Sequence, residues 1–122
     1  MVGGSISSYM EKKATKLDIK PFSVNDAWKG RRRRTENYKD FENAVFMLAP
    51  NGLKIPKGVP LRAIYWWGFS SNGSDYDNPI KPLQDVLSKK YGFNDNQIMQ
   101  GMQFKEVVPK GQEYVAFLIE PM

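Results

Sequence analysis

The segment over residues 61–69 restricts the fold more than any other part of the sequence. It reads LRAIYWWGF, which is rich in the aromatic and branched side chains that favour strands, and its length and alternation suit the central strand of a sheet. Neighbouring side chains of a strand point to opposite faces, so Trp66 and Trp67 are expected on different sides of that sheet. One of them should lie in the core, and the other should cover a helix or an interface with a second subunit.

Two helices are expected beside this strand. The first runs over residues 36–49, where Thr35 can cap it, and its apolar residues recur at helical spacing: Tyr38, Phe41, Val45 and Leu48. The second runs over residues 78–90, and Pro82 is expected to make its first turn irregular by removing a backbone hydrogen bond. Helical or alternating spacing also places a set of aromatic residues in the core: Tyr38, Phe41, Phe46, Phe104 and Phe117.

Three more strands are expected, over residues 16–20, 97–108 and 113–120, and the last two are expected to form a hairpin through Pro109 and Gly111. The order of elements is then β-α-β-α-β-β. This order predicts a small α/β protein, a single domain whose mixed sheet has helices packed against it. The domain is expected over residues 16–122, after a flexible N-terminal lead-in over residues 1–15 that is rich in glycine and serine.

The residue types that are missing narrow the chemistry. The sequence contains no cysteine and no histidine. Disulfides, thiol nucleophiles, ordinary zinc sites and histidine-based acid and base catalysis are therefore excluded. An enzyme of this composition has to work with carboxylates, Lys, Tyr or a hard metal ion bound through oxygen, which makes Mg²⁺ or Mn²⁺ the natural candidate.

The N-terminal residues have no apolar segment before a cleavage site, and no run approaches the ~18 apolar residues that a membrane span needs. The sequence therefore predicts a cytoplasmic protein that does not enter a membrane.

Positive charge is concentrated early in the chain. Lys and Arg number 18 against 13 Asp and Glu, and the formal net charge of +5 favours a polyanionic partner. The basic residues of one short stretch are candidates for contact with nucleic-acid phosphates: Lys29, Arg31, Arg32, Arg33 and Arg34. The alternative is a solvated surface loop. Trp28 beside it would stack on a base or, more simply, pack the loop onto the body.

Acidic residues gather later, in the segment DYDNPIKPLQD and in the turn NDNQ. Asp75 and Asp77 are two apart, so in an extended segment both carboxylates point to one side. Lys81 and Asp85 are four apart on one helix face and look back towards that pair, while Asp95 lies in the turn after the helix.

Carboxylates placed together repel unless a cation lies between them. Mg²⁺ held in this way can clamp a phosphodiester and polarise its oxygens. The alternative is that these aspartates only form turns and helix caps. A calcium-binding EF-hand loop is excluded, because Pro79, Ile80 and Val86 stand where an oxygen ligand, the turn glycine and the bidentate Glu belong. There is also no glycine-rich phosphate loop.

These residues resemble the RusA family of Holliday-junction resolvases. That family carries a D-x-D-N-x-x-K-x-x-x-D run, matched here by Asp75, Asp77, Asn78, Lys81 and Asp85. It also carries a D-D-x-Q turn, matched by Asn94, Asp95, Asn96 and Gln97, with Asn94 in place of the first carboxylate. A looser match lies at Pro21, Ser23 and Asn25. The resemblance is strong between residues 75 and 97.

The resemblance implies a RusA-like fold and a homodimer that binds four-way DNA junctions and makes paired, symmetric nicks with Mg²⁺, or Mn²⁺ in its place. Asp75, Asp77 and Asp95 would then ligate the metal, and Lys81 would steady the attacking water or the charge of the transition state. Asp85 is a supporting residue that a salt bridge to Lys81 explains equally well. Resolution of junctions implies a role in DNA recombination and repair, and because the family is common in phages and prophages, the resemblance also suggests the resolution of replication or packaging intermediates.

Two other functions remain open from the sequence. The first is a non-catalytic basic DNA-binding protein in which the carboxylates only organise turns. The second is a protein-interaction module whose basic loop meets an acidic partner.

Overall fold

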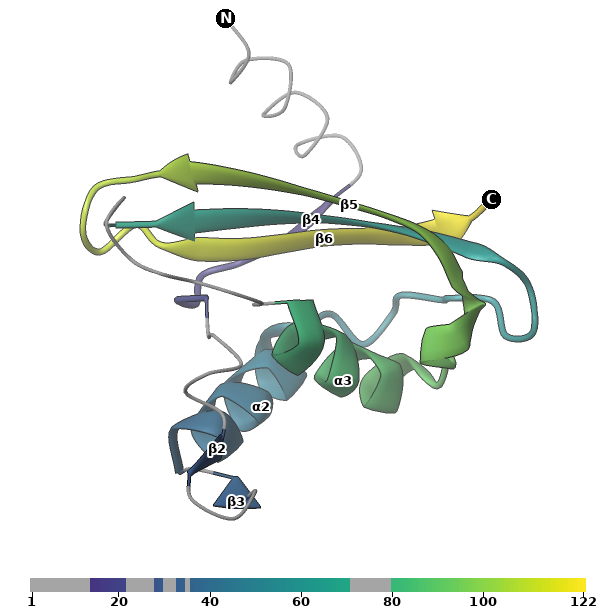
Figure 1. Ribbon diagram of the computed structural model, residues 1–122, viewed down its shortest axis with the longest axis horizontal. Helices are drawn as coiled ribbons and strands as arrows, with labels where there is room; N and C mark the ends of the chain where they lie inside the picture. The colour runs from purple at the N-terminus through teal and green to yellow at the C-terminus, as the bar shows by residue number, and fades with distance from the viewer. Residues whose placement is uncertain (1–13, 22–27, 30–32, 35, 71–79) are drawn as a thin grey trace, which may run out of the picture.

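The computed structural model describes residues 14–21, 28–29, 33–34, 36–70 and 80–122. Its main sheet has the order β1-β6-β4-β5, formed by β1 (Thr15–Leu17), β4 (Leu61–Phe69), β5 (Ile98–Val107) and β6 (Tyr114–Pro121). Two helices, α2 (Glu36–Leu48) and α3 (Ile80–Tyr91), lie on one side of this sheet (Figure 1). The predicted small α/β domain, with a mixed sheet and helices packed against it, is confirmed at this level. No described helix is long and apolar enough to cross a membrane.

β4 is one of the two inner strands of the sheet, and its bounds are those predicted from the sequence. β6 pairs with it antiparallel on one side and β5 pairs with it parallel on the other, with one irregularity between Leu61 and Arg62. All of its residues are buried except Arg62, whose guanidinium forms an ion pair with Glu120 at 2.9 Å. The aromatic run is therefore a strand that is buried on both faces and hydrogen-bonded along both edges.

The predicted hairpin between the last two strands is wrong. β5 and β6 do not pair with each other, because β4 lies between them. The connection β4-α3-β5 places β5 parallel to β4, as crossovers through a helix do. The chain then passes the end of β4, where the Val108 amide donates to the Phe69 carbonyl at 2.7 Å, and returns as β6 on the other side. The turn residues at 109–111 thus lie in a connection that crosses the end of β4.

The two tryptophans of β4 belong to different hydrophobic clusters, as predicted. Trp67 lies with Tyr65 on the face covered by α2 and α3, beside helix residues such as Val45 and Leu83. Trp66 lies on the opposite face in a cluster with Ile64, Tyr114 and Ala116, and its ring stacks on Phe104 with 6.0 Å between centroids. Both faces of β4 are therefore packed.

The helices confirm most of the predicted bounds and correct part of the predicted core. Phe46 and Leu48 were expected inside, but they are 47% and 49% exposed, while Ala49 is buried. The buried stripe of α2 continues from Val45 in a step of four residues to Ala49, so Leu48 falls beside it. In α3 the described helix begins at Ile80, which places Pro82 in its first turn. The carbonyl that the Pro82 nitrogen would face belongs to residue 78, outside the described residues, so the expected irregularity stays a prediction.

Gly68 shows how closely the strands fit. A Cβ added at this position would lie 2.3 Å from Cδ1 of Tyr114, and the Tyr114 hydroxyl is held by Glu106 at 2.6 Å. The ring of Tyr114 lies across β4 because Gly68 has no side chain.

Gly68→Ala is therefore expected to lower the free energy of unfolding by about 1–3 kcal/mol, since the ring of Tyr114 has to move. Chemical denaturation measures this change. Gly101→Ala is the matched control, because the space around Gly101 in β5 is open. Equal stability of the two variants would contradict the close packing.

Candidate active site

Of the predicted catalytic and metal-binding residues and the supporting Asp85, the structure describes three: Lys81, Asp85 and Asp95. Asp75 and Asp77, the other predicted metal ligands, lie outside the described residues, as do Asn78 and the basic residues Arg31 and Arg32. The arrangement around α3 and the turn after it can therefore be followed residue by residue.

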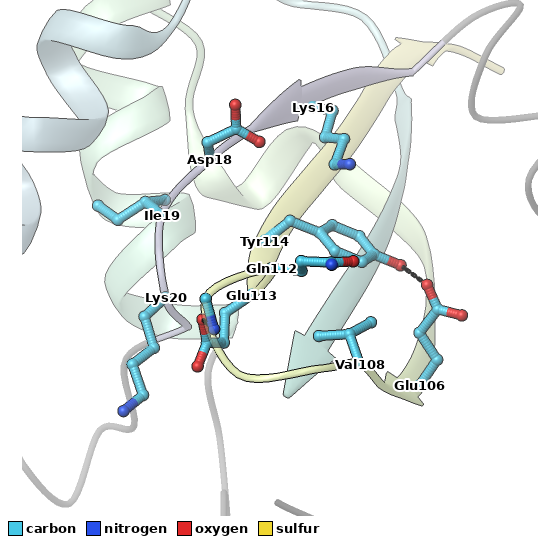
Figure 2. Close-up of a pocket in the computed structure, with 10 residues that line it drawn as sticks. Lys16, Asp18, Ile19, Lys20, Glu106, Val108, Gln112, Glu113 and Tyr114 are labelled. Atoms are coloured by element: carbon cyan, nitrogen blue, oxygen red, sulfur yellow. Dashed lines mark hydrogen bonds between the residues drawn. The ribbon is translucent and has the colours of Figure 1, made fainter. Parts of the chain in front are cut away.

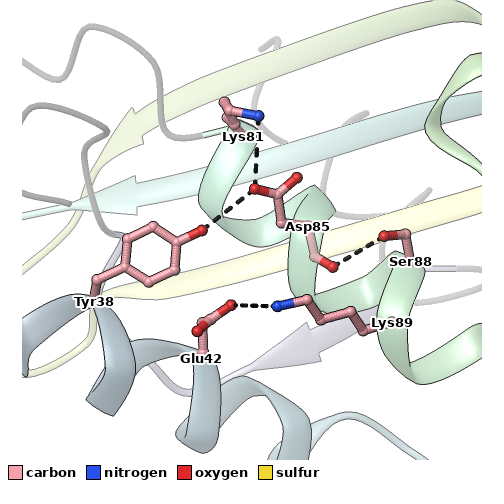
Figure 3. A network of polar contacts seen from close by, with 6 residues as sticks. All are labelled: Tyr38, Glu42, Lys81, Asp85, Ser88 and Lys89. Atoms are coloured by element: carbon pink, nitrogen blue, oxygen red, sulfur yellow. Dashed lines mark hydrogen bonds and ion pairs between the residues drawn. The ribbon is translucent and has the colours of Figure 1, made fainter. Parts of the chain in front are cut away.

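α3 presents Lys81 and Asp85 on one face, as their spacing predicted. The Lys81 ammonium lies 3.7 Å from Oδ2 of Asp85, and the Tyr38 hydroxyl of α2 donates to the same oxygen at 3.3 Å (Figure 3). One helical turn further along, Lys89 forms an ion pair with Glu42 of α2 at 3.2 Å. Asp85 is thus fixed by partners from both helices, which the interpretation as a simple Lys81 salt bridge did not include.

Asp95 begins η2 (Asp95–Gln97), the short 3-10 turn between α3 and β5. Its side chain reaches solvent, but partial burial raises the pKa of its carboxyl, and the negative charge of Asp85 raises it further. The positive charge of Lys81 acts in the opposite direction. The three residues therefore act on one another electrostatically, and the site holds more negative than positive charge.

Tyr65 is buried and Gln84 is the neighbour of Asp85 on α3, so we call this pair the floor of the site; sequence reasoning missed both. The Tyr65 hydroxyl of β4 donates to Oε1 of Gln84 at 2.7 Å. Burial raises the pKa of Tyr65, and the charge of Asp95 adds to this rise, so the phenol stays protonated. The alternation of β4 and the helical position of Gln84 beside Asp85 were the signals that could have found this pair.

The turn that matches the D-D-x-Q motif has a structural role at two of its positions. Asn94 caps η2, with its side-chain oxygen accepting from the Asn96 amide at 3.1 Å. Gln97 is buried; its Oε1 accepts from the Asn94 amide at 2.8 Å, and its Nε2 donates to the carbonyls of Pro56 and Val59. Asp95 is the carboxylate of this turn, and its side chain is not used by the cap.

The oxygen donors here fit a hard cation such as Mg²⁺ in their chemistry, because they are carboxylates with excess negative charge. Among the described residues, however, no three acidic side chains gather closely enough to form a metal site. A complete site would need carboxylates from outside these residues, and Asp75 and Asp77 are the predicted ones.

The basic stretch contains a small ribbon where a surface loop was expected. β2 (Trp28–Lys29) and β3 (Arg33–Arg34) pair antiparallel, with Trp28 opposite Arg34 and Lys29 opposite Arg33. In Figure 1 this ribbon lies beside α2, on the side of the helices that faces away from the main sheet.

A polar cavity of about 580 Å³ lies beside the connection from β5 to β6 (Figure 2). The Lys16 ammonium is 5.0 Å from the centre of the Tyr114 ring, and hydrogen bonds from Ser70 and from the Gly111 amide lower the pKa of Glu113. Its charged lining residues are two lysines and three carboxylates: Lys16, Lys20, Asp18, Glu106 and Glu113. With this mixture the cavity has no excess of positive charge for an anion, and it contains none of the predicted site residues.

No protein-family model matches this sequence, and a search of curated proteins finds no match to it.

The electrostatic coupling at Asp95 predicts opposite responses to two substitutions. Asp85→Asn is expected to lower the pKa of Asp95, and Lys81→Met is expected to raise it. A ¹³C NMR titration of the side-chain carboxyl measures both shifts. If neither substitution changed the pKa of Asp95, the coupling would be refuted.

Because the pKa of Asp95 is raised in the fold, its charge reduces stability as pH rises through that pKa. Asp95→Asn should therefore stabilise the protein near neutral pH and lose this advantage in acid.

Gln97 provides a test of the structural role of the turn. Gln97→Glu replaces two N–H donors by a carboxylate facing the carbonyls of Pro56 and Val59, and it should lower the free energy of unfolding by about 2–4 kcal/mol. Urea unfolding measures the loss. Gln100→Glu, at an exposed position of β5, is the control for the added charge and should change stability little.

Proposed function

We propose that the protein is a magnesium-dependent endodeoxyribonuclease that resolves four-way DNA junctions by paired, symmetric nicks, as the resemblance to the RusA family implies. On this proposal it is a homodimer that acts in the cytoplasm in DNA recombination and repair, and Mn²⁺ can replace Mg²⁺. The observation that carries the proposal is the grouping of Asp95, Asp85 and Lys81, whose charges act on one another at the surface of α3 and η2.

The excess of negative charge supports a cation at this place. Lys81 forms an ion pair with Asp85 and also lowers the pKa of Asp95, but that pKa is still raised, so the folded protein resists the ionised form of Asp95. A bound cation removes this penalty, and a chain without histidine or cysteine has oxygen ligands to offer. Asp75, Asp77 and Asp95 are the proposed ligands, and Mg²⁺ when bound would supply positive charge to the oxygens of a phosphodiester.

The described residues around the proposed metal position have supporting roles in the reaction. Asp85 holds Lys81 by its ion pair, and Tyr38 fixes the carboxylate of Asp85 from α2. The Lys81 side chain is 58% exposed, so its ammonium can reach a phosphate oxygen as negative charge develops there. Tyr65 and Gln84 keep the floor of the site rigid through their 2.7 Å hydrogen bond. Asp85 is on this view a positioning residue for Lys81.

Cleavage of a labelled synthetic four-way junction with Mg²⁺ tests the proposal. The natural protein should produce paired nicks, while Asp95→Asn and Asp77→Asn should each reduce the rate by at least about a hundredfold, because a ligand of the metal is lost. Asp40→Asn, which changes the same charge at an exposed position of α2, is the matched control and should cut normally. A linear duplex serves as the substrate control.

The other outcomes decide between the remaining functions. Tight junction binding without cleavage in either Mg²⁺ or Mn²⁺ would replace the proposal by a non-catalytic DNA-binding protein. Lack of DNA binding even at low salt would favour a protein-interaction module. A calorimetric titration with Mg²⁺ alone gives an independent reading, since affinity for the metal should fall in Asp95→Asn and persist in Asp40→Asn.

A further inference from the structure

One face of β5 carries a row of exposed residues at alternate positions. Gly101, Gln103 and Lys105 are all exposed, and they pair in register with residues of β4 that face the helices: Ala63, Tyr65 and Trp67. Alternate residues of a strand lie about 6.6 Å apart on one face. The row begins a few residues after Asp95, because β5 follows η2 directly, and Gln103 lies opposite Tyr65, the floor residue of the candidate active site.

Gln103 is held by a buried donor. The indole Nε1 of Trp67 donates to Oε1 of Gln103 at 2.9 Å, and an indole N–H can only donate, so the orientation of the amide is defined. Trp67 is itself fully buried and its ring stacks on that of Tyr65, 5.6 Å away. The amide nitrogen of Gln103 has no partner among the described residues. A fixed N–H donor is therefore presented at the surface.

The charges of β5 are separated between its faces. Lys105 lies in the exposed row and forms no ion pair within the part of the chain that the structure describes. Glu106, the acidic residue of the strand, points to the opposite face, where it accepts from the Tyr114 hydroxyl at 2.6 Å. The row thus offers a positive charge without a neighbouring negative one on the same strand face, which favours an anion.

Gly101 adds space to the row. No atom lies within 4 Å of the place that a Cβ would occupy there, so nothing in the described protein requires a glycine. A glycine in a strand often marks a place where another backbone approaches closely. The absence of a side chain at Gly101 therefore leaves room for a bulky partner to contact the backbone of β5.

We infer that the row of Gly101, Gln103 and Lys105 is a contact track for the sugar–phosphate backbone of one nucleic-acid strand, which it leads past Asp95. Lys105 would neutralise one phosphate, Gln103 would donate to another phosphate oxygen, and Gly101 would let the backbone approach. This inference rests on the proposed function, since it names the surface by which the same site receives its substrate. Such contacts position a strand without reading its sequence.

Binding of a fluorescently labelled four-way junction, measured by anisotropy in EDTA over a range of salt concentrations, tests the track without cleavage. Lys105→Gln should weaken binding about fivefold to tenfold at 100 mM salt and reduce the salt slope by about one, as expected for one lost phosphate contact. Lys110→Gln, in the connection after β5, removes the same charge and should leave the affinity unchanged. Gln103→Leu should weaken binding with no change in the salt slope.

Gly101→Val is the sharpest variant. Valine suits a strand and meets no atom of the described protein, so the variant should unfold at the same or a higher temperature than the natural protein. Its junction affinity should nevertheless fall several-fold, because the side chain would stand where the DNA backbone lies. Loss of affinity with retained stability supports the track.

The results that overturn the inference differ from those that overturn the nuclease proposal. If the natural protein binds and cuts junctions while all three variants bind normally, the track is wrong and the nuclease remains. If it binds without cutting and the variants weaken binding, the nuclease is wrong and the track remains. Absence of any DNA binding overturns both.

A change of mass in light scattering for Gly101→Val would instead identify this face as a protein interface, to which the exposed Val107 would contribute.

Discussion

β4 lies between two strands and beneath two helices, so each of its residues has to fit several neighbours at once. Tyr65 and Trp67 fill the helix-side core with their rings, while their polar atoms reach Gln84 and Gln103 at its margin. Burying these aromatic rings without their hydrogen bonds would carry a cost, and the two glutamines remove it. The same strand therefore builds the core and fixes the polar groups around the candidate site.

The candidate active site is supported from two directions. Asp85 is held on α3 by Lys81 and from α2 by Tyr38, while the turn carrying Asp95 is held by Gln97, whose amide bonds to the carbonyls of Pro56 and Val59. These contacts oppose the repulsion between the carboxylates. The repulsion between the carboxylates is thus offset by contacts with residues outside the group of Asp85, Asp95 and Lys81.

Features with a local cause could be predicted from the sequence. The bounds of β4, the start of α2 at Glu36 and the pairing of Lys81 with Asp85 all follow from periodicity within one element. The hairpin between β5 and β6 failed because turn residues do not reveal whether another strand lies between the two they connect. The contacts of Tyr65 with Gln84 and of Tyr38 with Asp85 were missed for a related reason, since each joins two different elements whose packing the sequence pattern of either one does not reveal.

The position of β6 has a consequence for how the sheet assembles. β6 pairs with β4 on one side and with β1 on the other, and the pair Thr15 and Phe117 is separated by about a hundred positions in the sequence. Closing so long a loop costs conformational entropy, and this cost is offset only by the contacts that form once the strand is in place. The pairs between β4 and β5 are 37 or 38 positions apart in the sequence, against 46 to 60 for those between β4 and β6, so the β4-α3-β5 unit can form first and β6 can join it. The attachment of β1 is then expected to be the slowest step of folding.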